Sequence, residues 1–303
     1  MHIELLGRGD RLGANITSFI AQIIYAFHHK IFILYNRNYI EHGDNVRFVP
    51  YNQNYNNSIF IQTLFDFIDY HNSILESNGE IFGEKIHMFS IHYFEIISKV
   101  LLDIKIDFFT YWKTNIHPFV FKTFITKSIE NKYNNIIPFD PRKTILIHLR
   151  LDDVKNYPDY DGYHCADHFR KNINNDILID NNTHHHIKNI YPHCNTQAPL
   201  PKWKIDNQIK IALEKYPNYE IVLLTNPGEN TSEYSYRCIQ NDDESLDLFL
   251  LSICEVVILS KSTFSLSSFF FSVAKEVYVP LWGHIVCFGL FTKYDNTKFT
   301  YFS

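Results

Sequence analysis

The sequence lacks any apolar run long enough to cross a membrane, which takes about 18 consecutive apolar residues. The apolar stretch FSLSSFFFSVA at 264–274 is shorter and predicts a buried helix. The N-terminal stretch MHIELLGRGDRLGANI contains no apolar segment of the kind that a signal peptide or a membrane anchor needs. We therefore expect no transmembrane segment and a location in the cytoplasm.

Basic residues are not in excess. Lys and Arg number 28 against 33 Asp and Glu, which gives a net charge of -5. No basic surplus is available to neutralise a nucleic-acid backbone, so nucleic acid is not expected as a partner, although this charge is compatible with a local site for one or two phosphates. The five cysteines are an odd number and contain no CxxC pair, which argues against a disulfide framework and favours a reducing compartment.

Several catalytic motifs are missing as well. The sequence has no nucleophile elbow, no protein-kinase signature and no HExxH helix. Gly7, Gly9 and Gly13 lie in the predicted turn between the first strand and the first helix, but their spacing matches neither GxGxxG nor the phosphate-binding GxxxxGK[ST] loop. Glycines in such a turn still allow a ligand to approach the backbone closely.

What is present is the composition of a globular protein, with 46% hydrophobic and 20% charged residues. The chain begins with a predicted strand, helix and strand within residues 2–35, and a mostly helical region follows at 59–129. The proline-containing segment 131–143 is the predicted linker between two domains. We place the first domain at residues 1–135 and the second at residues 142–303.

The second half alternates strands and helices. Strands that are apolar throughout and separated by helices predict a parallel sheet covered on both faces, so the fold class is α/β with a Rossmann-like second domain. A polar, histidine-rich insertion interrupts this pattern at about 159–202. The predicted strands are 144–149, 219–225, 256–260 and, as the last strand, 277–280; the predicted helices are 207–218, 242–255 and 265–276.

Polar residues follow three of these strands. Ligands bind a parallel sheet beyond the carboxyl ends of its strands, and Arg150, Asn226 and the segment SKSTFS at 260–265 lie at such ends. Arg150 can clamp a diphosphate with two hydrogen bonds, or it can form a structural ion pair with Asp152 or Asp153. SKSTFS can offer backbone N–H groups and hydroxyls to an anion, or it can be an ordinary helix N-cap.

Two features raise the question of a metal. Asp159 and Asp161 form a DxD pair that could hold a divalent ion, and the insertion is rich in His and Cys, from His164 to Cys194. The DxD pair, however, lies in a predicted loop rather than after a strand, and the spacing of the His and Cys residues matches no standard zinc site. We therefore assign no metal ligands and expect no cofactor.

Taken together, three segments resemble the fucosyltransferase superfamily. ILIHLRLDD at 145–153 resembles its HxRRxD segment, and DRLGANITSFIAQIIYAF at 10–27 resembles its first loop and helix. The segment 247–271 resembles the Asp-led helix, strand and SxSTFS of the bacterial α-1,2 type, including the 263 − 247 = 16 positions from Asp247 to Thr263. The resemblance implies a GT-B glycosyltransferase, in which two Rossmann-like domains enclose a cleft for a nucleotide-sugar donor.

The resemblance also implies roles for individual residues in an inverting, metal-independent reaction. Arg150 holds the diphosphate and offsets the charge that grows on it as the sugar bond breaks, while His148 and Asp247 are candidates to read the guanine. Asp152 or Asp153 matches the motif's aspartate; Asp153 falls in the stricter register, and we expect it to be catalytic together with Arg150. The expected donor-binding residues are Gly13, His148, Arg150, Asn226, Asp247, Ser262, Thr263, Phe264 and Ser265.

One position departs from the family pattern. Leu151 stands where the family has its second arginine, which in the α-1,2 and α-1,6 enzymes helps to hold the donor. The general base is open between Asp153, Asp159, Asp161 and His164. We expect transfer of fucose from GDP-fucose to a glycan hydroxyl by a bacterial or viral enzyme. The alternatives are another nucleotide sugar, a non-catalytic protein that binds glycans or nucleotides, and, as a distant third, a zinc-dependent hydrolase.

Overall fold

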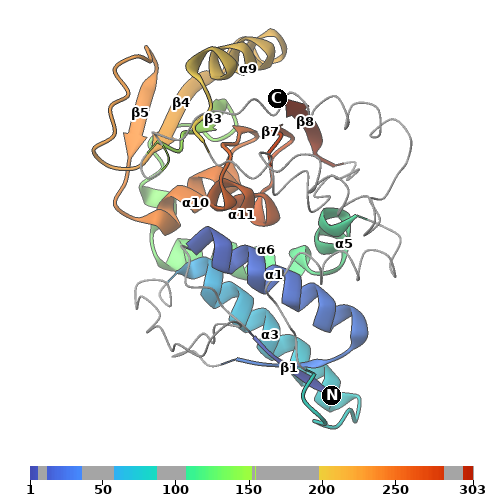
Figure 1. Cartoon of the computed structure of the whole chain (residues 1–303). Helices are drawn as coiled ribbons and strands as arrows, with labels where there is room; N and C mark the ends of the chain where they lie inside the picture. The colour runs from blue at the N-terminus through green and yellow to red at the C-terminus, as the bar shows by residue number, and fades with distance from the viewer. Residues whose placement is uncertain are drawn as a thin grey trace, which may run out of the picture. The chain divides into compact units, whose positions relative to one another are not determined.

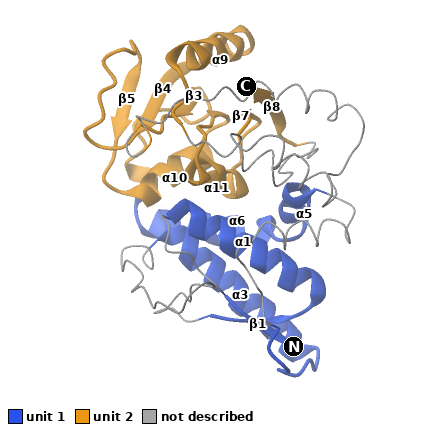
Figure 2. Ribbon diagram, in the orientation of Figure 1, with its two compact units in different colours: residues 1–132 blue, residues 133–303 orange. Residues whose placement is uncertain are grey.

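The computed structural model describes residues 1–5, 12–35, 58–86, 107–151, 154, 198–282 and 296–302. The chain divides into two compact units, residues 1–132 and 133–303, which Figure 2 shows in separate colours. The boundary between the units falls within the segment 131–143 that was predicted as a linker, and a short 3-10 helix, η1 (Tyr133–Asn135), follows it. Among the helices in the described part of the chain, none combines the length and apolar character that crossing a bilayer requires.

Unit 1 begins with a strand, a helix and a strand, as predicted (Figure 1). β1 (His2–Glu4) and β2 (Phe32–Leu34) are parallel, and α1 (Leu12–His29) connects them in the chain. α1 forms because apolar residues recur at helical spacing, and every residue of the helix from Leu12 to Ile24 is buried. Those without exposed surface include Ile16, Phe19, Ile20, Ile23 and Ile24.

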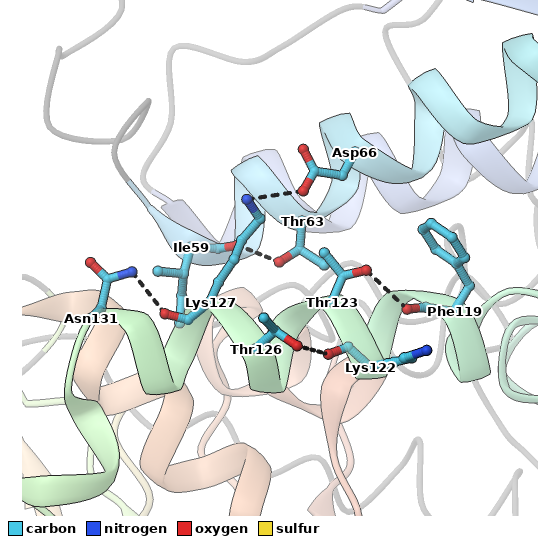
Figure 3. A network of polar contacts seen from close by, with 9 residues as sticks. All are labelled: Ile59, Thr63, Asp66, Phe119, Lys122, Thr123, Thr126, Lys127 and Asn131. Atoms are coloured by element: carbon cyan, nitrogen blue, oxygen red, sulfur yellow. Dashed lines mark hydrogen bonds and ion pairs between the residues drawn. The ribbon is translucent and has the colours of Figure 1, made fainter.

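Helices also make up most of the other residues of unit 1 that the structure describes, 58–86 and 107–132. They are α3 (Ile59–Ser77), α5 (Phe108–Asn115) and α6 (His117–Glu130). α3 packs on α6 through aromatic rings, with the centroids of Phe60 and Phe124 4.8 Å apart. Beside this contact, Figure 3 shows the ammonium of Lys127 pointing to the carboxylate of Asp66, at 2.9 Å. The helical region predicted at 59–129 is thus confirmed in its described parts.

Unit 2 contains a six-stranded sheet in which every neighbouring pair is parallel. The strand order is β5-β4-β3-β6-β7-β8, which is 3-2-1-4-5-6 when the strands are numbered along the unit. This is the order of a doubly wound, Rossmann-like sheet. The α/β prediction is confirmed, whereas the two-domain GT-B architecture stays a prediction. The strands are β3 (Thr144–His148), β4 (Glu220–Thr225), β5 (Arg237–Gln240), β6 (Val256–Ile258), β7 (Glu276–Pro280) and β8 (Lys298–Phe302).

Two strands of this sheet were not predicted. β5 and β8 form its two edges, and the prediction that 277–280 is the last strand was wrong. The central strands β3, β6 and β7 are buried at every position, while β5 and β8 are partly or fully exposed at most of theirs. An edge strand has no second neighbour, so its sequence is not a continuous apolar run.

Helices cover the two faces of the sheet (Figure 1). α9 (Lys202–Lys215) packs on the face that carries Ile145 and Ile147 of β3, together with apolar residues from neighbouring strands. α10 (Glu244–Ile253) and α11 (Thr263–Phe271) lie on the other side, where a hydroxyl–carbonyl hydrogen bond of 3.4 Å joins Ser252 to Ser268. Side chains alternate along a strand, so Leu146 and His148 face α10 and α11.

α11 ends earlier than predicted, at Phe271 rather than at residue 276. The next residue, Ser272, has an extended backbone with ψ 147°, and its hydroxyl accepts a hydrogen bond of 2.9 Å from the N–H of Ala274. This local bond competes with the helical pattern. The chain is thereby turned into β7, which begins at Glu276.

Glu276 is a buried carboxylate at the first position of β7, with 2% of its side chain exposed. It pairs with Lys215, accepts a hydrogen bond of 3.0 Å from the Tyr216 hydroxyl and lies 3.7 Å from the Lys298 ammonium. Burial by itself raises the pKa of this carboxyl, but the bonds from Lys215 and Tyr216 and the charges of the two lysines outweigh it, and the pKa is lowered. The cluster therefore stabilises the ionised form and ties α9 to β7 and β8.

We expect Glu276→Gln to lower the free energy of unfolding at pH 7 by about 2 kcal/mol, because it removes hydrogen bonds to a charged, buried acceptor. Since the pKa is lowered in the folded state, this contribution is present above the unfolded pKa and disappears as the pH falls below about 4. Urea unfolding at pH 7 checks the prediction. Glu220→Gln is the control, because Glu220 makes a 3.5 Å ion pair with Arg237 at an exposed edge and should cost less than about 0.5 kcal/mol.

Candidate ligand site at the carboxyl edge of the sheet

The candidate site lies where the two central strands, β3 and β6, end. From β3 the sheet continues to β4 and β5, and from β6 it continues in the opposite direction to β7 and β8. This reversal is the topological switch point of a doubly wound sheet, and ligands of such sheets bind outside the carboxyl ends of the strands there. The side chains that follow β3 and β6 are therefore the first to consider.

His148 is the last residue of β3 and is 5% exposed. Its Nδ1 atom lies 2.6 Å from the hydroxyl of Ser260, which follows β6, so a hydrogen bond joins the two strand ends. Its ring also lies beside that of Phe264 in the first turn of α11, with the centroids 5.4 Å apart. These contacts bring His148 and the segment SKSTFS together at the carboxyl edge of the sheet, while the predicted ligand roles of both stay predictions.

Ser260 lies in the predicted segment SKSTFS but was not among the expected donor-binding residues. It is 4% exposed, and its hydroxyl lies 3.3 Å from that of Ser265, which also bonds the backbone carbonyl oxygens of Ser260 and Ser262, at 3.2 and 3.3 Å. A serine at the end of an apolar strand is common and gives no signal by itself. The neighbouring Lys261, also only 4% exposed, was likewise not among the expected donor-binding residues.

The segment SKSTFS forms the N-terminus of α11, as predicted. Ser262 is the N-cap, and its hydroxyl accepts a hydrogen bond of 3.1 Å from the N–H of Phe264. The N-cap interpretation of Ser262 is therefore confirmed. Thr263 and Phe264 are half-buried and Ser265 is fully buried. The anion-binding interpretation of the same segment stays a prediction, and it is compatible with a helix N-terminus at this place.

Asp247 is buried in the first turn of α10, with 5% of its surface exposed. It accepts a hydrogen bond of 2.6 Å from the amide of Asn241, which follows the end of β5. Burial raises the pKa of the Asp247 carboxyl to about 7, the bond from Asn241 opposes this rise, and the charges of Asp243 and Glu244 add to it. A buried acid with a raised pKa at the carboxyl edge of the sheet is a candidate for a functional residue.

β4 also ends in polar residues. Thr225 is 1% exposed, and its hydroxyl is the only buried side-chain oxygen or nitrogen in the described residues that has no hydrogen-bond partner. Unpaired polar groups of this kind are rare in folded proteins. Asn226 follows it and is half-buried, at the start of a turn in which Gly228 has φ +80°.

The other predicted residues are distributed as follows. Arg150 lies two residues beyond β3 and is partly buried. Gly13 is the second residue of α1, where its carbonyl oxygen accepts a hydrogen bond of 2.8 Å from Thr17, so its predicted place in the preceding turn was wrong. Asp153 lies outside the described residues. So do Gly7, Gly9, Asp152, Asp159, Asp161, His164 and the insertion up to residue 197.

Within the described ranges, no group of three or more His, Cys, Asp and Glu side chains is placed to hold a metal ion. The two cysteines that the structure describes, Cys238 and Cys254, are free thiols. No protein-family model matches the sequence, and no curated protein matches it. The interpretation of the site therefore depends on the geometry of its residues and on the sequence motifs.

Proposed function

We propose that this chain is an inverting glycosyltransferase that moves a sugar from a nucleotide-sugar donor to a glycan hydroxyl, with GDP-fucose as the donor. The observation that carries the proposal is the hydrogen bond between His148 and Ser260 across the switch point of a sheet with order 3-2-1-4-5-6. Nucleotides bind sheets of this order at that point. Two of the three segments that resemble fucosyltransferases contain these strands: 145–153 includes the end of β3, and 247–271 includes β6.

The described residues suggest how the donor would be held. The base would contact His148 and Asp247, one buried on β3 and one in the first turn of α10. The diphosphate would lie near Arg150 and the N-terminus of α11, where a cation and backbone N–H groups favour negative charge. As the sugar bond breaks, the diphosphate gains charge, and Arg150 would stabilise it without a metal ion.

Calorimetric titration tests the proposal. The probes are GDP, UDP, GDP-fucose, GDP-mannose and UDP-sugars, each with and without EDTA. We expect GDP and GDP-fucose to bind and the affinity to be insensitive to EDTA. Binding of UDP in place of GDP would be compatible with the proposed fold but would overturn the fucose assignment. Another nucleotide sugar is the nearest alternative, because Leu151 stands where the family has its second arginine. If no nucleotide binds, a non-catalytic glycan-binding protein becomes the better interpretation.

A further inference from the structure

A groove runs along one side of α6 in unit 1, next to α3. Its volume is about 380 Å³, at the lower end of the range of about 300 to 1,000 Å³ that is typical of small-molecule sites. Asp66 lines the groove from α3, and the residues of α6 that line it recur every three or four positions, on one side of the helix. Those of α6 are Phe119, Lys122, Thr123, Thr126, Lys127 and Glu130. None of these residues belongs to the candidate site in unit 2.

The charges in the groove are balanced. The ammonium of Lys127 pairs with the carboxylate of Asp66 at 2.9 Å. Lys122 and Glu130 are both exposed, and neither forms an ion pair with another residue that the structure describes. Two ammonium groups and two carboxylates leave no net charge, so the groove does not concentrate anions such as phosphate and suits a neutral ligand.

The polar groups of the groove can both donate and accept hydrogen bonds. The Thr123 hydroxyl donates to the carbonyl oxygen of Phe119 at 3.3 Å, and the Thr126 hydroxyl donates to that of Lys122 at 3.1 Å. Each hydroxyl oxygen can therefore still accept a bond from a ligand. The ammonium of Lys122 only donates, and the carboxylate of Glu130 only accepts. Sugar hydroxyls do both, so they can bond every one of these groups.

An aromatic ring completes the lining. Phe119 is half-buried, and its ring stacks on that of Tyr70 in α3, with the centroids 4.3 Å apart and the planes at 14°. Figure 3 shows Thr123 between the ring of Phe119 and the ammonium of Lys127. Stacking on Tyr70 holds the ring in place beside the polar groups. A ligand that suits this lining carries hydroxyls around its rim and has an apolar C–H face, as a sugar ring does.

We propose that the groove between α3 and α6 binds a neutral carbohydrate of about one or two sugar rings, the size that its volume allows. The inference deepens the proposed function, and it rests on that function only in giving this carbohydrate the role of the acceptor glycan. Binding in the groove requires no nucleotide, so it can be measured separately from the donor.

A microarray of neutral and sialylated oligosaccharides, probed with the full chain in the absence of nucleotide, tests the inference. We expect neutral glycans to bind, with no gain in signal from a sialic acid. The strongest binder is then titrated calorimetrically into variants of the groove. Lys122→Met, which keeps the aliphatic stem, and Phe119→Leu, which keeps an apolar side chain, should each weaken binding about fivefold to tenfold.

Matched controls separate binding from folding. Lys122→Met should unfold at the same urea concentration as the wild type, because the side chain is exposed. Lys210→Met makes the same change at an exposed lysine of α9 and should leave glycan affinity unchanged. Thr126→Val should weaken binding about threefold to fivefold, whereas Thr114→Val, at an exposed threonine of α5, should not.

The outcomes distinguish this inference from the proposed function. If no glycan on the array binds, or if the groove variants bind the glycan as the wild type does, the inference is overturned, and a peptide of mixed charge becomes the better-suited ligand. If glycan binding is weakened in the groove variants but neither GDP nor UDP binds, the carbohydrate site stands and the proposed function fails. If GDP binds and glycan affinity is unchanged in the groove variants, the proposed function stands and this inference fails.

Discussion

Replacing Arg150 with alanine is expected to lower the rate of sugar transfer by about a hundredfold to a thousandfold, the range seen when one electrostatic stabiliser of a developing charge is removed. Arg150 lies two residues beyond β3, at the carboxyl edge where the diphosphate would bind. GDP affinity should fall as well, because the same side chain would contact the ground-state diphosphate. Arg150→Lys should recover only part of the loss, since an ammonium lacks the two-pronged geometry of a guanidinium.

The matched control lies before the other end of the same strand. Arg142 is an exposed arginine that precedes β3, at the amino edge of the sheet, so Arg142→Ala removes the same charge away from the site. It should leave GDP binding and transfer unchanged. Steady-state transfer assays and GDP titrations on the two variants are the measurement. Unaltered GDP binding and transfer in Arg150→Ala would refute the assignment of the diphosphate to this arginine.

Replacing Asp247 with asparagine is expected to stabilise the protein at alkaline pH. The pKa of the carboxyl is 3.8 in the absence of interactions and about 7 in the folded protein. Between these values the unfolded chain has lost the proton and the folded chain has kept it, so stability falls as the pH rises. At about 1.4 kcal/mol per pH unit, the full loss above pH 7 has an upper limit of about 4 kcal/mol. Asparagine does not ionise and avoids this loss, while its carbonyl oxygen can still accept the bond from Asn241.

Urea unfolding at pH 5.5 and pH 8 measures this effect. The advantage of Asp247→Asn over the wild type should grow by about 1 to 2 kcal/mol between the two values. At pH 8 the same variant should bind GDP about tenfold or more weakly, because it loses a charged hydrogen-bond acceptor. Asp242→Asn, at an exposed carboxylate nearby, should show neither change. A variant that is less stable than the wild type at pH 8 would show that the charge of Asp247 stabilises the fold.

The centre of the fold could be read from the sequence, and its edges could not. TILIH in β3 and VVI in β6 are continuous apolar runs because a central parallel strand is buried on both faces. RCIQ in β5 and KFTYF in β8 mix polar and apolar residues because each lies at an edge. The end of α11 was also missed, because the apolar pattern continues past Phe271 and the stop is made by the Ser272 hydroxyl.

The candidate site shows a similar division. His148, Ser262 and Asp247 could be predicted because they occupy motif positions next to recognisable strands and helices. Ser260 and Asn241 could not, because their importance comes from a partner that is distant in the sequence: His148 for Ser260, 112 positions away, and the α10 carboxylate of Asp247 for Asn241. Serine and asparagine are also common at the ends of strands for local reasons. Only the three-dimensional structure identifies which of them support the site.

The position of β3 beside β6 has a consequence for how the chain folds. Ile145 pairs with Val256, 256 − 145 = 111 positions later, whereas β6 and β7 are consecutive in the chain. Closing so long a loop is entropically costly and slow, so we expect the middle of the sheet to assemble after its neighbouring strands. A ligand that binds to both β3 and β6 would stabilise the pairing of these two strands. By mass action it would also stabilise the native state. The abundance of the protein in a cell would then depend on the supply of its own nucleotide ligand.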